Sequence, residues 1–254
     1  MEILGVELSS NAAEQVQKLC DSFTKRVKYI YSDDNVNEGV STDDADGSDD
    51  TDGKGRYTVY LPSNLDRRTF EANILYELFH IRQFEAGFPT LCNKDSILFD
   101  RASDLVNGLG SSIFFGVLDL DVFERMRECR YIDAVYRFVE SIFESLVAYA
   151  SNFFGDLDDK YNFAQLVLDL SKLLYHDNAE YDRQIRESYR DFPRVLEQSF
   201  ALRDMMRKNP PATPESAAVT MGKLIDALEL WDLFYIKLND DKIRTSAEFA
   251  AFCE

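Results

Sequence analysis

The chain is poor in the residues that build disulfides, metal sites and nucleic-acid surfaces. Its 254 residues include four cysteines and two histidines, and its formal net charge is −18. The cysteines are far apart and form no CxxC pair, which predicts free thiols in a reducing compartment: Cys20, Cys92, Cys129 and Cys253. The excess of acidic residues argues against binding to a nucleic-acid backbone or to an anionic membrane surface, because both carry negative charge.

The sequence also lacks the features that direct a chain to a membrane. It does not open with a basic segment followed by an apolar run, so we expect no signal peptide. No stretch approaches the run of about 18 apolar residues that a membrane-spanning helix needs. We therefore expect an intracellular, cytoplasmic protein. The apolar fraction of 45%, with 13% aromatic residues, is typical of a globular chain that builds a hydrophobic core.

Helical periodicity dominates the chain from Asp95 onward. The helices predicted there are 96–109, 122–128, 131–154, 160–175, 179–208 with a break at Pro193, 214–238, and a short turn at 246–252. Before Asp95 the predicted order is helix 10–25, strand 27–31, strand 56–61 and helix 65–89. The fold class expected is therefore α+β and predominantly helical. An N-terminal αββα unit over 1–94 is followed by a helical bundle over 95–254, packed with it as one body.

An acidic loop, 33–55, separates the two predicted strands. Between residues 33 and 53 it holds nine Asp or Glu and no Lys or Arg, which is half of the net charge. We expect a hairpin with this loop as its long polar tip. The run 43–53 resembles parts of a calcium-binding loop, but it lacks the Glu that an EF-hand places at its twelfth position. A solvated, self-repelling loop is the preferred interpretation.

The helix predicted over 65–89 carries the candidate site. Asn64 is its expected N-cap, and Gly87 is suited to the left-handed position that ends it. Apolar residues occupy more than one side of this helix, so much of its circumference is expected to be buried. One arc of about 120° is polar and is expected to line a cleft: Asn73, Tyr76, Glu77, His80 and Gln83.

The five residues 76–80, YELFH, stand where a zinc peptidase carries HExxH. In that motif two His bind one zinc ion, and the Glu between them is the general base that acts on zinc-bound water. Glu77 and His80 are present here, but Tyr76 replaces the first His. A phenol with a pKa near 10 is a poor zinc ligand. The structural alternative is a helix with one partly buried His held by a neighbouring carboxylate.

The run 56–89, RYTVYLPSNLDRRTFEANILYELFHIRQFEAGFP, resembles the strand and active helix of zincin-type peptidases. It is most similar to the small intracellular kind related to the ImmA/IrrE proteins, and the match covers about a quarter of the chain, from about Arg56 to the region of Tyr131. The resemblance implies that Glu77 matches the general base and His80 the second zinc ligand. Tyr76 occupies the place of the first ligand and departs from the family pattern.

The resemblance also implies a third, acidic ligand on a following helix. The candidates are Asp100, Asp104, Glu140 and Glu144. A different alignment puts this position at Ser111 or Ser112, where the ligand is lost. His176 is a further candidate for the missing imidazole, and its structural alternative is a cation at a helix C-terminus.

Three functions follow as hypotheses. The leading one is a zincin-fold protein with a degenerate metal site, a non-hydrolytic pseudopeptidase that acts by binding a partner protein and needs no cofactor. The first alternative is an active intracellular zinc metallopeptidase, in which Tyr76 or His176 and a carboxylate complete the ligand set of His80. The second alternative is an acidic helical interaction module unrelated to peptidases.

Overall fold

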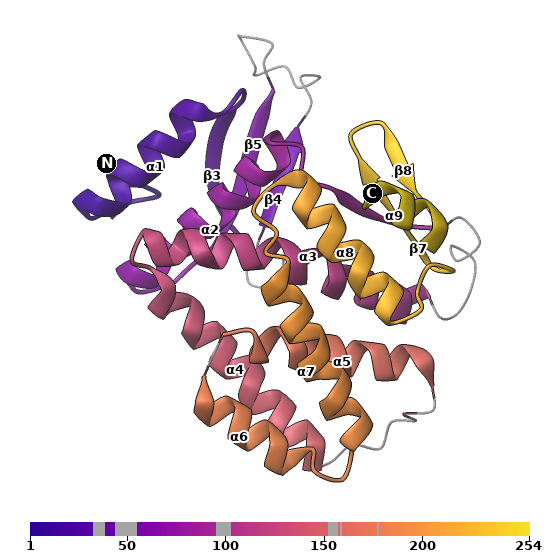
Figure 1. The fold of residues 1–254 in the computed structure, drawn as a ribbon. Helices are drawn as coiled ribbons and strands as arrows, with labels where there is room; N and C mark the ends of the chain where they lie inside the picture. Colours follow the sequence, from indigo (N-terminus) through magenta and orange to yellow (C-terminus); the bar gives the residue numbers. More distant parts are fainter. Residues whose placement is uncertain (33–38, 44–54, 95–102, 152–156, 158, 177) are drawn as a thin grey trace. The chain divides into compact units, whose positions relative to one another are not determined.

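The computed structural model describes residues 1–32, 39–43, 55–94, 103–151, 157, 159–176 and 178–254. Most of the described residues lie in helices, and the strands form small sheets, which confirms the predominantly helical α+β class (Figure 1). The chain divides into two compact units. The first unit is Met1–Ala86 with Val122–Arg137, and the second is Gly87–Asp121 with Phe138–Glu254.

The first unit begins with a short strand pair and a helix. Strands β1 (Glu2–Ile3) and β2 (Val6–Glu7) pair antiparallel, and α1 (Ser10–Ser22) follows. Ser9 is the N-cap of α1, because its side chain accepts a hydrogen bond from the backbone N–H of Ala12. The buried side chains of α1 recur every three or four residues: Ala12, Val16 and Leu19.

The sheet of the first unit contains one strand that the sequence did not reveal. Its strands are β3 (Arg26–Ser32), β4 (Gly39–Asp43) and β5 (Arg56–Pro62), in the order β3-β5-β4. β3 runs parallel to β5, and β4 runs antiparallel to it. The predicted hairpin of β3 and β5 is therefore wrong, since parallel strands need a crossover connection. β4 escaped prediction because it lies inside the acidic run and lacks an apolar pattern.

Helix α2 (Arg67–Glu85) packs against α1, β5 and β4. It begins after Asp66, whose carboxylate accepts a hydrogen bond from the backbone N–H of Thr69 at 3.1 Å. The predicted cap Asn64 instead has a φ of 66° and belongs to the turn before the helix. Gly87 follows the C-cap with a φ of 76°, which confirms its predicted place at the helix end.

A single long helix, α3 (Ser103–Glu128), replaces the two shorter ones predicted here. Its three glycines suggest a break, but Leu109, Ile113 and Val117 are fully buried, and this burial outweighs the low helix propensity of Gly. By length and composition alone, Leu105–Glu128 is also long and apolar enough to cross a membrane, contrary to expectation. Half of its most apolar window is buried inside the protein, and a core helix has the same property.

Helix α4 (Ile132–Ser151) follows α3 after a tight turn. Arg130 sits in this turn with a φ of 65°. The last residues of α3, the turn and the first residues of α4 belong to the first unit, and the rest of both helices belongs to the second. The first unit thus combines two segments of chain that are distant in sequence.

The second unit continues with α5 (Lys160–Leu174), α6 (Ala179–Ser188), α7 (Pro193–Lys208) and α8 (Pro214–Ala227). The predicted break at Pro193 is confirmed, since α7 starts there. The helix predicted to reach residue 238 is wrong in its second half. The residues after Ala227 turn and then form β7 (Phe234–Leu238), which follows the alternation of a strand.

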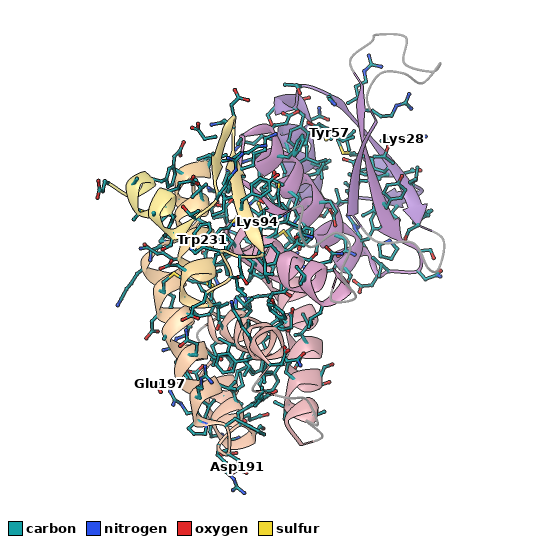
Figure 2. The ribbon with its side chains drawn as sticks, turned by 90° about the vertical axis from the view of Figure 1, so that its right-hand side faces the viewer. Lys28, Tyr57, Lys94, Asp191, Glu197 and Trp231 are labelled. Atoms are coloured by element: carbon teal, nitrogen blue, oxygen red, sulfur yellow. The ribbon has the colours of Figure 1, made fainter. Side chains whose placement is uncertain are left out.

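The second sheet joins segments that lie far apart in the sequence. β6 (Thr90–Asn93), β7 (Phe234–Leu238) and β8 (Asp241–Ile243) pair antiparallel in that order. The Lys94 ammonium donates hydrogen bonds to the carbonyl oxygens of Trp231 and Arg244 beside this sheet. Figure 2 labels Lys94 and Trp231. The chain closes with α9 (Ser246–Phe252), which confirms the predicted final turn.

Candidate functional site

The polar stripe of α2 lies in the first unit among buried apolar side chains. Tyr76, Glu77 and His80 are half-buried. Leu75 and Leu78, which flank them in the sequence, are fully buried. The mixture of polar and apolar neighbours follows from a helix that is covered on more than one side.

Tyr76 and His80 are in direct contact. Their ring centroids are 4.6 Å apart, and the ring planes stand at 83°, an edge-to-face arrangement. Tyr76 also lies 6.5 Å from the ring of Phe123, near the end of α3. These distances are those of favourable aromatic pairs. Tyr76 therefore belongs to an aromatic cluster with His80 and Phe123.

His80 is also contacted from the next turn of α2. Its Nδ1 lies 3.1 Å from Oε1 of Gln83. The Gln83 residue is 2% exposed, so its amide is fixed in the protein interior. The imidazole is thus held by Tyr76 from the preceding turn and by Gln83 from the following one.

The other predicted ligands lie outside the first unit or outside the described residues. Asp100 is not among the described residues, and Asp104 falls in the first turn of α3 within the second unit. Glu140 and Glu144 are exposed on the part of α4 that belongs to the second unit. Among the residues that the structure describes, no three His, Cys, Asp or Glu side chains are grouped so that they could hold a metal ion.

His176 also lies in the second unit, just beyond the C-terminus of α5. Its ring centroid is 5.9 Å from that of Tyr175, in an edge-to-face arrangement. This location agrees with its structural alternative as a side chain at a helix C-terminus. In the alternative alignment the third ligand position falls at Ser111 or Ser112. The Ser112 hydroxyl accepts a hydrogen bond from the Gln165 side chain at 2.7 Å.

A buried carboxylate that the sequence did not suggest lies on the same helix. Glu71 is 3% exposed and accepts hydrogen bonds from the Ser9 backbone N–H at 2.5 Å and from the Ser9 hydroxyl at 3.0 Å. It also accepts from the Tyr131 hydroxyl at 2.5 Å and from Arg67 Nε at 3.0 Å. Burial raises the pKa of Glu71, but the hydrogen bonds from these partners outweigh it and leave the pKa lowered.

Further contacts around Glu71 connect the turn before α4 with α1 and α2. Arg68 stacks over the Tyr131 ring, with 4.0 Å from its Cζ to the ring centroid, and donates to Asp133 at 2.6 Å. Asn11 donates to the carbonyl oxygen of Cys129 at 3.1 Å. A sequence signal for this cluster exists, because Glu71 lies three residues before Ile74 on the apolar side of α2.

A second carboxylate joins the end of α2 to the sheet. Glu85 accepts hydrogen bonds from the Thr24 backbone N–H and from the Tyr57 hydroxyl, both at 2.9 Å. Burial and then the bond to Glu85 raise the pKa of Tyr57 to about 12. Both carboxylates accept hydrogen bonds from donors of the first unit, so these contacts hold its segments together.

The chain stands apart in comparisons with known proteins. No family model matches it, and it matches no curated protein and no solved structure.

Proposed function

We propose that this protein is a zincin-related pseudopeptidase, which binds a segment of a partner protein and does not hydrolyse it. The observation that carries the proposal is the edge-to-face contact of Tyr76 with His80 at 4.6 Å, at the position where a zinc peptidase has its first imidazole ligand. Glu77 and His80 keep their motif positions on the same helix.

Tyr76 is poorly suited to replace the lost ligand. The reference pKa of a tyrosine phenol is near 10, so forming a phenolate at neutral pH is costly. Turning the ring toward a metal would also disturb its contacts with His80 and Phe123, and each such aromatic pair contributes about 0.5–1.5 kcal/mol. His80 with one carboxylate would supply two protein ligands, and a catalytic zinc site has three.

The loss of a ligand removes the role of Glu77 as well. In a zinc peptidase the general base acts on a water molecule whose pKa the metal has lowered to about 7. A carboxylate alone cannot supply that activation. Glu77 is then a half-buried carboxylate on the helix that packs against the sheet.

The sheet of the first unit offers a place for a bound segment. β4 is one of the two edge strands in the order β3-β5-β4, and α2 packs against β4 and β5. An edge strand presents a row of backbone N–H and C=O groups that its one neighbour does not use. We propose that an extended segment of the partner adds to this edge, so that backbone hydrogen bonds provide affinity.

Metal analysis of the purified full chain tests the decay of the zinc site. We expect zinc far below one equivalent in the wild-type protein, with no change in His80→Ala. His176→Ala is the matched control because these are the two histidines of the chain. Stoichiometric zinc that is lost in His80→Ala and kept in His176→Ala would contradict the proposal. Loss in both variants would indicate the alternative ligand set with His176.

A hydrolysis assay tests the same point by chemistry. We expect the wild-type protein to leave unfolded casein intact with and without a chelator. Cleavage that stops on adding a chelator and in Glu77→Gln would establish the active metallopeptidase instead. Glu124→Gln, an exposed residue near the end of α3, serves as the control for a loss of charge.

Proline substitution in β4 tests the binding edge. In an antiparallel pair, successive residues direct their N–H groups alternately toward the partner strand and away from it. Of Ser41→Pro and Thr42→Pro, one therefore removes a bond to β5 and lowers thermal stability, and the other removes an outward donor. Peptides selected by display against the wild-type protein should lose binding to the variant that keeps its stability. Equal binding to that variant would refute the edge as the docking site.

A further inference from the structure

Gln83 occupies a position from which it can control the His80 ring. It is 2% exposed, and its Oε1 lies 3.1 Å from Nδ1 of His80. An amide oxygen only accepts hydrogen bonds, so a bond between these two atoms requires the proton to be on Nδ1. The contact with Tyr76 on the preceding turn restricts rotation of the same ring.

We infer that Gln83 is a positioning residue, which fixes His80 as the Nδ1–H tautomer and leaves Nε2 as its basic nitrogen. A metal-binding imidazole almost always has such a partner on its second nitrogen, because that hydrogen bond sets the tautomer and the ring orientation. The degenerate site therefore retains one ligand in a prepared state. The site lacks the first imidazole. The assignment of the His80 tautomer does not depend on the proposed function; only the effect of Gln83 on zinc affinity rests on it.

The tautomer itself is measurable on the wild-type protein without any metal. We expect nitrogen NMR of the protein labelled at histidine, at about pH 8 and above the ordinary imidazole pKa of about 6.5, to show His80 protonated at Nδ1. A His176→Ala sample assigns the two histidines. A signal from an Nε2–H tautomer of His80 would overturn the inference.

Variants of Gln83 separate positioning from packing. Gln83→Glu keeps an acceptor and should keep the Nδ1–H tautomer, whereas Gln83→Leu should shift His80 toward the Nε2–H form. Thermal unfolding checks that both variants are folded. An unchanged tautomer in a folded Gln83→Leu protein would contradict the inference. Loss of the Nδ1–H form of His80 in a folded Gln83→Glu protein would also contradict it.

The consequence toward zinc is tested in the Tyr76→His background, which restores the HExxH motif. We expect Tyr76→His to bind zinc more tightly than the wild-type protein, and Gln83→Leu in that background to weaken the affinity by about 10- to 100-fold. An equal affinity with and without Gln83 would refute its positioning role. Stoichiometric zinc in the wild-type protein would instead refute the proposed function, so the two failures are distinguishable.

Discussion

Replacing Glu71 with Gln should destabilise the first unit more than any other single exchange of a polar residue on α2. The carboxylate is 3% exposed and accepts bonds from Ser9, Tyr131 and Arg67. A Gln side chain has the same size but only one acceptor oxygen, so its NH₂ group meets at least one of these donors. The variant therefore keeps the volume of the side chain but loses the negative charge and one of the two acceptor oxygens.

The magnitude follows from the burial of each partner. Arg67 is 53% exposed on its side chain, so its ion pair with Glu71 contributes only about 0–1 kcal/mol. Ser9 and Tyr131 decide the effect, because hydrogen bonds to a charged group contribute about 1.5–3 kcal/mol each and an unsatisfied buried donor adds a penalty. We expect Glu71→Gln to lower the free energy of unfolding by about 3 kcal/mol, and Arg67→Ala by less than about 1 kcal/mol.

Urea unfolding with two probes measures this effect. The single Trp of the chain, Trp231, lies in the second unit, so its fluorescence follows that unit. Far-UV circular dichroism follows the helices of both units. In Glu71→Gln we expect the dichroism transition to move to lower urea. A free energy of unfolding within about 0.5 kcal/mol of the wild-type value would refute the reasoning from burial.

A double-mutant cycle and a pH series sharpen the test. Glu71→Gln and Tyr131→Phe should be non-additive, because they remove two ends of one hydrogen bond. The lowered pKa of Glu71 means that its contribution is complete above the unfolded pKa of about 4.3 and is lost as the pH falls through the lower folded value. The difference in stability between wild type and Glu71→Gln should therefore shrink in acid. A constant difference would show that the charge is not its source.

Three further changes have clear expected outcomes. Gly222→Ala should destabilise by about 1–3 kcal/mol and speed proteolysis of α9, because a Cβ there would lie 2.2 Å from the Phe249 ring; unchanged stability would refute this close packing. Gly108→Ala should stabilise by roughly 0.5–1 kcal/mol, since a Cβ would meet nothing within 4 Å on this helix, and a measured loss would contradict it. Glu85→Gln should lower the pKa of Tyr57 from about 12 while burial keeps it above its ordinary value, as NMR titration of the ring would record.

Local physical chemistry allowed the sequence to predict several boundaries. Pro193 starts α7, and Gly87 ends α2 with a left-handed φ of 76°, because these preferences depend on one residue and its neighbours. The four-residue spacing of Tyr76 and His80 likewise predicts that their rings share one face of a helix, and they are 4.6 Å apart.

Contacts between distant residues required the tertiary structure. The parallel pairing of β3 with β5 depends on a third strand that has no apolar alternation. Glu71 meets Ser9 and Tyr131, which lie 62 and 60 residues away, and no local pattern specifies such partners. The motif on α2 is thus encoded by helical spacing, whereas the hydrogen bonds and the burial around it arise only when remote segments pack together, because burial is a property of the folded chain.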